Sequence, residues 1–266
     1  MSPQPKAETL LSQLFRRRRD LEASFHNSFL LDEVEARRLS KALQTESAKG
    51  SISQLERGAV LHELAYVEGL RGQLSTALDF MDRALRCGLD RLAISVSKAH
   101  ILIMFGRFID ARVELETIDF ESVPASAQGS IRGLCEEVGM YVEASKFDAG
   151  THASEFFSPE AKKILNDANI NEVEVTRRLD YAAAIVSAHS KHRLIAYDLF
   201  AMDGEGILFR FVIDAPIDDL LSLDWEITGG VAKTFNGPVD DILSIGVKPF
   251  SKGEKHIEFG AYNVDI

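Results

Sequence analysis

The sequence has few cysteines, and it lacks both a signal-peptide pattern and a long apolar run. Its two cysteines, Cys87 and Cys135, lie in helical patterns among apolar residues, which favours buried, reduced thiols over a disulfide framework. No stretch approaches the roughly 18 continuous apolar residues that a membrane helix needs, and the first residues lack the charged-then-apolar pattern of a signal peptide. We therefore expect a protein that has no membrane segment and resides in the cytoplasm.

Basic residues are fewer than acidic ones: the sequence has 30 Lys and Arg and 41 Asp and Glu, which gives a formal net charge of −11. Residues 1–54 carry nine basic and seven acidic residues, net +2. Residues 55–150 carry ten and fifteen, net −5, and residues 151–266 carry eleven and nineteen, net −8. An acidic surface repels a phosphate backbone, so nucleic-acid binding is disfavoured. For the run of four arginines at residues 16–19, we favour a solvated helix face over a nucleic-acid or targeting patch.

The motifs that identify common enzyme classes are missing. The sequence has no Gly-x-Ser-x-Gly nucleophile elbow, no dinucleotide-binding fingerprint and no zinc-protease helix. His189 and His192 are three residues apart at the end of a helical pattern, but no third ligand is near in sequence, so we assign no metal site. Lys233 follows Ala232 and not the glycine that a phosphate loop requires. We assign no catalytic residue and no cofactor, and whether the protein is an enzyme stays open, with the balance against it.

What the sequence does contain is a repeating pattern of small residues in its middle third. Three times, a glycine is followed five residues later by an alanine and an amphipathic helical pattern. The copies are Gly72 with Ala77, Gly106 with Ala111 and Gly139 with Ala144, and the upstream residues Ala65 and Ala99 are also equivalent. The first two copies are 34 residues apart and the third follows after 33. Glycine permits a tight turn between helices and alanine permits close packing, so the pattern predicts three stacked helical hairpins.

This spacing resembles tetratricopeptide repeats, over residues 55–150 only. The sequence departs from that family where Glu68 replaces a usual aromatic residue, where Arg132 replaces a small one, and in the missing closing proline. The resemblance implies an all-α array that binds another protein or a peptide in a groove lined by the first helix of each hairpin. A helical array of another family, built on the same physics, is the alternative.

The resemblance also implies which residues line that groove. Carried over to this sequence, the positions are His62, Tyr66, Val96, His100 and Ile103. The lysine and asparagine with which some family members clamp a peptide carboxylate are missing from these positions. A mixed aromatic, aliphatic and imidazole groove suits a helix or an extended segment with apolar anchors. The alternative is that these side chains pack inside the array.

Flanking segments complete the domain organisation. Residues 6–26 and 31–45 have apolar residues in helical spacing, which predicts a divergent helical hairpin within residues 1–54. We therefore expect a helical repeat domain over residues 1–150 and a linker over residues 151–158.

Residues 159–266 have a different pattern. Helices are expected from Ser158 and over residues 171–190, followed by a β-hairpin of residues 193–202 and 207–213. A further helix begins after Pro216 and should weaken or end at Gly229 and Gly230. Strands are expected over residues 242–247 and 257–264. The order of elements predicts a small α+β domain with a mainly antiparallel sheet, so the whole chain is expected to have an α+β fold.

These features favour a protein–protein interaction adaptor, with a partner segment on the helical repeats and the α+β domain holding a second partner or forming a homodimer. The final strand, which runs to residue 266, is a candidate edge for pairing with another chain. The first alternative is an enzyme with an unrecognised active site in residues 159–266. The second is an acidic regulator, chaperone or inhibitor of a basic partner protein.

Overall fold

The computed structural model describes residues 9–147, 157–252 and 257–258. It divides into two compact units, which we call the N-terminal unit (described residues up to Ile94) and the C-terminal unit (described residues from Ser95 onward). The sequence placed the boundary in a linker at residues 151–158, most of which lies outside the described residues. The structure instead groups the later helical hairpins with the sheet, because a long helix of the sheet region packs on the turns at Gly106 and Gly139.

The N-terminal unit is helical. Its elements are α1 (Leu10–Ser28), α2 (Glu33–Ser47), α3 (Gln54–Leu70), α4 (Leu74–Arg86) and the beginning of α5 (Arg91–Met104). The helices expected within residues 1–54 are therefore present as α1 and α2. Local caps explain two of the starts. The Asp32 carboxylate accepts hydrogen bonds from the amides of Val34 and Glu35 at α2, and Ser53 and Glu56 form a capping box at α3.

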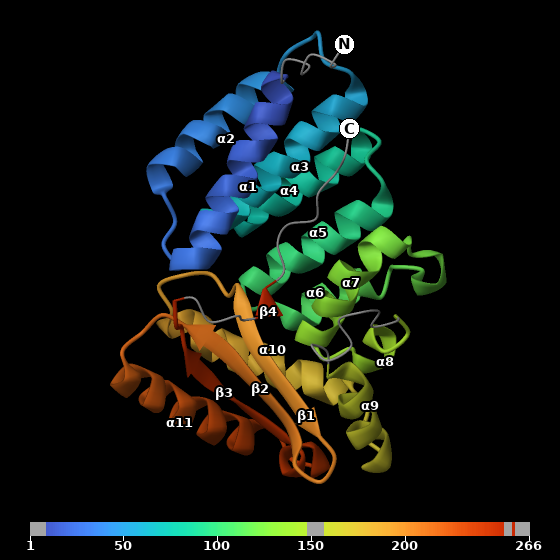
Figure 1. The fold of residues 1–266 in the computed structure, drawn as a ribbon, viewed down its shortest axis with the longest axis vertical. Helices are drawn as coiled ribbons and strands as arrows, with labels where there is room; N and C mark the ends of the chain where they lie inside the picture. Colours follow the sequence, from blue (N-terminus) through green and yellow to red (C-terminus); the bar gives the residue numbers. More distant parts are fainter. Residues whose placement is uncertain (1–8, 148–156, 253–256, 259–266) are drawn as a thin grey trace, which may run out of the picture. The chain divides into compact units, whose positions relative to one another are not determined.

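The C-terminal unit combines helices with a four-stranded sheet, which confirms the α+β fold (Figure 1). After α5 its helices are α6 (Phe108–Leu115), η1 (Phe120–Ser122), α7 (Ala125–Glu137), α8 (Tyr141–Ala144), α9 (Ser158–Asp167), α10 (Val173–His189), α11 (Ile217–Thr234) and η3 (Pro238–Asp241). Its strands are β1 (Ala196–Met202), β2 (Gly206–Ile213), β3 (Leu243–Pro249) and β4 (Ile257–Glu258). None of the helices in the described ranges is both long and apolar enough to cross a lipid bilayer.

The sheet has the strand order β3-β2-β1-β4. The predicted hairpin is confirmed as β1 and β2, which pair antiparallel with Leu199 opposite Phe209. The β1–β4 pair is also antiparallel, whereas β2 and β3 are parallel and are connected through α11. The sheet is thus mainly antiparallel, as expected. The final strand, expected over residues 257–264, is described only at residues 257–258, where it is a sheet edge, so dimerisation through it stays a prediction.

Helix α11 continues past Gly229 and Gly230, where the sequence indicated a weakening or an end. Its inner face buries Leu220, Leu223 and Ile227, and this tertiary packing outweighs the low helix propensity of two glycines. Gly230 lies against the ring of Tyr181 on α10, since a Cβ atom there would come within 2.9 Å of that ring. A small residue at this position therefore allows α10 and α11 to pack closely.

The three repeat glycines end their helices in the same way. Gly72, Gly106 and Gly139 have φ values of 83°, 71° and 78°, in the left-handed region that glycine enters without strain. In each turn the amide of the residue after the glycine donates to the carbonyl of the residue four positions before the glycine. The N···O distances are 2.8, 3.0 and 2.7 Å. This is the Schellman arrangement. The turns that the sequence predicted from spacing are therefore present, at the junctions α3–α4, α5–α6 and α7–α8.

Within the C-terminal unit, α10 packs directly on two of these turns. A Cβ atom on Gly106 would come within 3.1 Å of the Ala183 carbonyl oxygen, and one on Gly139 within 2.8 Å of Val175 Cγ1. Helix α10 also caps α6, which follows the turn at Gly106, because the Ile109 amide of α6 donates to Asp180 Oδ1 of α10 at 3.0 Å. Two turns of the hairpins are thereby fixed to the helix that also packs on α11.

Candidate functional site

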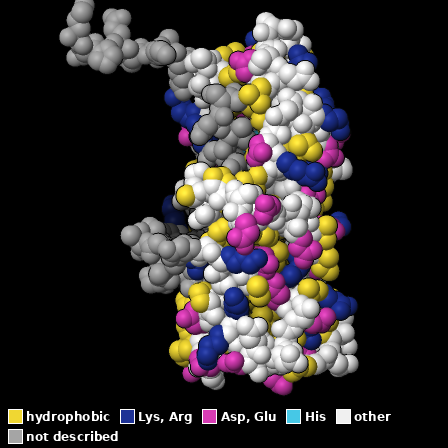
Figure 2. All heavy atoms as spheres, turned by 90° about the vertical axis from the view of Figure 1, so that its right-hand side faces the viewer, with side chains coloured by type: hydrophobic (Ala, Val, Ile, Leu, Met, Phe, Trp, Pro, Cys, Tyr) yellow, Lys and Arg dark blue, Asp and Glu magenta, His cyan; other side chains and the backbone are white. Residues whose placement is uncertain are grey.

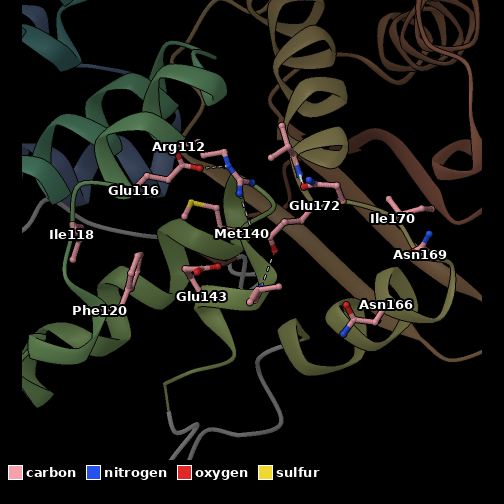
Figure 3. Close-up of a pocket in the computed structure, with 13 residues that line it drawn as sticks. Arg112, Glu116, Ile118, Phe120, Met140, Glu143, Asn166, Asn169, Ile170 and Glu172 are labelled. Carbon is pink, nitrogen blue, oxygen red and sulfur yellow. Dashed lines mark hydrogen bonds and ion pairs between the residues drawn. The ribbon is translucent and has the colours of Figure 1, made fainter.

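A cavity of about 780 Å³ in the C-terminal unit is the candidate site, and we call it the cleft. Three segments form it: α6 with the loop that leads to η1, the start of α8, and the turn between α9 and α10 (Figure 3). Its lining residues are Arg112, Glu116, Ile118, Phe120, Met140, Val142, Glu143, Asn166, Asn169, Ile170, Asn171, Glu172 and Val173. The protein face that carries α7, α8 and α9 in Figure 1 shows acidic side chains interspersed with basic and apolar ones (Figure 2).

Arg112 joins the walls of the cleft. Its guanidinium donates from Nη2 to Glu172 Oε1 at 3.1 Å, from Nη1 to Thr176 Oγ1 at 2.9 Å, and from Nε to Glu116 Oε1 at 2.7 Å. The side chain is buried. A planar guanidinium with several fixed donors suits such a junction better than a flexible ammonium. Arg112 therefore connects α6 to the start of α10.

Glu172 is the counterpart of Arg112 across the cleft. Its Oε2 accepts the Val142 amide at 2.9 Å, which caps α8 because the backbone position before that helix offers no side-chain cap. Burial raises the pKa of the Glu172 carboxyl above its ordinary value, although the Val142 amide and Arg112 both oppose this rise. Since both carboxylate oxygens are engaged, this residue serves as a structural anchor and not as a free catalytic base.

The rim of the cleft carries three asparagines. Asn169 has φ of 53° and ends α9, where its short polar side chain tolerates the left-handed region. Asn171 Oδ1 accepts the Val173 amide at 2.9 Å. Within the described ranges the side chains of Asn166 and Asn169 make no hydrogen bond, and both residues are exposed. Their carboxamides are therefore free to bind a ligand, each as donor and acceptor.

An apolar wall lies opposite these amides. Figure 3 shows Ile118, on the loop after α6, and Phe120, the first residue of η1, across the cleft from Asn166, Asn169 and Ile170. The three carboxylates of Glu116, Glu143 and Glu172 against the single guanidinium of Arg112 give the lining a net charge of −2. The cleft thus offers carboxamides, negative charge and an apolar surface to a ligand, and no nucleophile with an adjacent base.

The five groove positions implied by the repeat resemblance are buried. His62 and Tyr66 lie on α3 in the N-terminal unit, with their rings in an edge contact at 5.2 Å between centroids. The other three positions lie on α5 in the C-terminal unit: Val96, His100 and Ile103. None of the five side chains is more than 4 % exposed. The structure gives these residues packing positions, and partner binding through them stays a prediction.

The repeat-defining alanines also occupy packing positions. Each of them has no exposed surface: Ala65, Ala77, Ala99, Ala111 and Ala144. A larger side chain at these positions would push the helices apart.

The two histidines near the end of α10 do not converge on one point. His189 Nδ1 lies 2.9 Å from the Ile185 carbonyl, whereas His192 Nε2 accepts the Asp214 amide at 3.1 Å. Burial lowers the pKa of His192 below its ordinary value. Among the described residues, no group of three or more His, Cys, Asp or Glu side chains is placed to hold a metal ion.

Sequence reasoning missed the cleft residues Arg112 and Glu172. They are 60 positions apart and meet only because α10 packs on the hairpin turns. No signal within either segment could have identified the pair.

It also missed Arg18, which is buried although the arginine run was interpreted as a solvated face. Leu14, Leu21 and Phe25 are buried on the same side of α1, at helical spacing from Arg18. This spacing was the signal that one arginine of the four points inward.

Several buried titratable groups lie on α7 and next to it. Burial raises the pKa of Cys135 and of Tyr141 far above their ordinary values, which leaves the thiol inert. Burial also raises the pKa of Glu136 and brings that of Glu137 to about 8, from an ordinary value of 4.5.

We expect the Glu137→Gln variant to gain stability relative to the parent protein as pH rises. Between pH 4.5 and pH 8 the folded protein keeps a proton that the unfolded chain has released, so the free energy of unfolding of the parent protein falls as pH increases. Glutamine does not titrate, so the variant lacks this loss. Its free energy of unfolding should exceed that of the parent protein by a margin that grows by at most about 1.4 kcal/mol per pH unit. Urea unfolding at several pH values measures it. An advantage that does not change with pH would show that Glu137 titrates normally in the folded state.

Comparison with protein-family models, with curated protein sequences and with solved structures found no match. We therefore infer function from the geometry of the site.

Proposed function

We propose that this protein is a protein-interaction adaptor that binds an extended, basic segment of a partner protein in the cleft. The observation that carries the proposal is the combination of free carboxamides, a net negative lining and an apolar wall in one cavity of about 780 Å³. The TPR-like hairpins serve as the scaffold in this proposal. The presence of two free cysteines, one of them buried, supports a reducing, cytoplasmic location.

Each part of the cleft suits a different part of such a segment. A carboxamide donates and accepts at once, so Asn166 and Asn169 match the N–H and C=O groups of an extended peptide backbone. Glu116 and Glu143 attract a lysine or arginine side chain. Phe120 is half-buried and offers the rest of its ring to a neighbouring apolar side chain, beside the buried Ile118, and such an anchor supplies most of the affinity in a small interface.

The arrangement favours binding over catalysis. The most buried carboxylate, Glu172, is held by Arg112 and the Val142 amide. Glu116 and Glu143 each use only Oε1 in an ion pair within the described part of the chain, with Arg112 Nε at 2.7 Å and with Lys146 Nζ at 3.4 Å, so Oε2 of each is left for a cation of the ligand. The lining of the cleft has no histidine, serine or cysteine, so it offers no nucleophile for these carboxylates to activate.

Selection from a displayed library of random linear peptides tests the proposal. We expect the full chain to enrich peptides in which Lys or Arg stands next to an apolar residue. Affinity for a selected peptide should fall by about tenfold or more in Glu116→Lys and fall also in Asn166→Ala. It should also weaken as salt concentration rises.

The matched control is Glu205→Lys, which makes the same charge change in the exposed β1–β2 turn outside the cleft. Fluorescence anisotropy with a labelled peptide gives the affinities, and circular dichroism checks that each variant folds. Enriched peptides without basic residues, or equal losses in Glu116→Lys and Glu205→Lys, would contradict the proposal.

A further inference from the structure

Helix α11 carries an apolar stripe on its outer side. Ile217, Leu221 and Trp225 follow one another at intervals of four residues and are 68 %, 56 % and 78 % exposed. The inner face of the same helix packs against α10 and β3, and Figure 1 shows α11 along the β3 side of the sheet. Exposed apolar side chains in a contiguous row mark an interaction surface. Trp225 is the only tryptophan of the chain and the most exposed large apolar residue in the described part of the chain.

Gly229 continues the stripe by one more interval of four residues. Unlike Gly230, it faces open space, because a Cβ atom there would meet nothing within 4 Å. Glycine inside a helix costs stability relative to alanine, and the packing of the described residues gives no reason for it. A position without a side chain allows another helix to approach the backbone closely.

The two ends of α11 carry opposite charges on the exposed side. Asp218 lies at the N-terminal end and Lys233 at the C-terminal end, and both are exposed. Neither side chain forms an ion pair within the described residues. Trp225 lies midway between the two, near the centre of a helix that spans Ile217–Thr234.

These positions make the stripe complementary to itself when a second copy runs antiparallel. A two-fold axis at Trp225 places Leu221 of one copy over Gly229 of the other, so a large side chain meets an open position. The same axis places Asp218 of one copy opposite Ala232 of the other, one position from Lys233, and the long lysine side chain can reach the carboxylate, which pairs opposite charges at both ends. A parallel arrangement would instead bring Asp218 and Asp219 of the two copies together.

We propose that two copies of this chain associate through α11, antiparallel and centred on Trp225. The occupant of the stripe is thus a second copy and not a different protein. One helix pair is a small interface, so we expect a reversible dimer with a dissociation constant on the order of 10 μM. This inference does not rest on the proposed function of the cleft.

Sedimentation equilibrium of the full chain, from about 1 to about 500 μM, measures the association. Fluorescence supplies a second readout, because emission from the single tryptophan should shift to shorter wavelength as the dimer forms. We expect Trp225→Ser to weaken the dimer by about 30-fold or more. Gly229→Gln should weaken it by about tenfold or more while raising the melting temperature, since glutamine favours the helix.

The matched control is Val113→Ser, which removes an exposed apolar side chain from α6 and should leave the dissociation constant unchanged. The charge pair tests the orientation. Asp218→Lys and Lys233→Asp should each weaken the dimer, and the double variant should restore it. A monomer at every concentration would overturn the proposal. So would a dimer that is indifferent to Trp225→Ser, or a double variant that remains as weak as the single ones.

Discussion

Arg18→Met is expected to destabilise the N-terminal unit by roughly 3–5 kcal/mol, the largest effect of any substitution considered. The Arg18 guanidinium has no exposed surface and lies 2.7 Å from Glu63 Oε2, and it also pairs with Glu22. Burial opposes the charge on Arg18, but Glu63 and Glu22 outweigh this and raise its pKa above the ordinary value. Methionine keeps much of the length of the side chain and removes the charge, which leaves the buried Glu63 carboxylate with only the His62 ring, 3.4 Å from its Oε1, and without the guanidinium.

Urea unfolding monitored by circular dichroism measures this loss. Arg19→Met, one position along on the exposed side of α1, is the matched control and should change the free energy of unfolding by no more than about 0.5 kcal/mol. The double variant Arg18→Met with Glu63→Gln should recover part of the loss, because a neutral carboxamide then replaces the buried carboxylate. Equal small effects of Arg18→Met and Arg19→Met would show that Arg18 is solvated, as its place in a run of arginines first indicated.

Gly139→Ala is expected to destabilise the C-terminal unit by roughly 2–4 kcal/mol. Part of the loss comes from backbone strain, because φ at Gly139 is 78° and a residue with a Cβ atom disfavours that region by about 1–2 kcal/mol. The rest comes from overpacking, since the new methyl group would approach Val175 Cγ1 to 2.8 Å and push α10 away from the α7–α8 turn. The cleft should be disturbed too, because the same packing brings Glu172 to the Val142 amide.

The control makes the same chemical change inside α7, the helix that Gly139 follows. Gly129 lies inside α7, has nothing within 4 Å of a Cβ position and has no positive φ. Gly129→Ala should therefore stabilise the protein, by roughly 0.5–1 kcal/mol. Thermal and urea unfolding of both variants measure the change in the free energy of unfolding, which should be negative for Gly139→Ala and positive for Gly129→Ala. Destabilisation of similar size at both positions would mean that neither the turn geometry nor the contact with α10 explains the role of Gly139.

Much of the local structure could be predicted from the sequence, because short-range signals determine it. Helix starts are indicated by Ser53 with Glu56 and by Asp32, and the turn that ends a helix is indicated by the glycine of each repeat. Alternating apolar residues on both sides of the Asp203–Gly204 turn identify the β1–β2 hairpin. These features need only neighbours within about five residues.

The candidate site could not be predicted, because its parts come from distant segments. Arg112 follows a repeat alanine and Glu172 precedes α10, and neither segment indicates that the two side chains meet. The parallel pairing of β2 with β3 likewise depends on how α11 packs. The packing of α11 also keeps it helical at Gly229 and Gly230, where helix propensity alone predicted a break. Tertiary contacts decided each of these points, and local patterns do not encode them.

The position at which a bound peptide lies tests the central claim most directly. A selected basic peptide that carries a photoreactive benzoylphenylalanine at its apolar position can be cross-linked to the full chain, and mass spectrometry then locates the attachment. We predict attachment at residues 116–120, on the apolar wall of the cleft, and its loss in Glu116→Lys. Attachment on α3 or α11, unaffected by that substitution, would contradict the account.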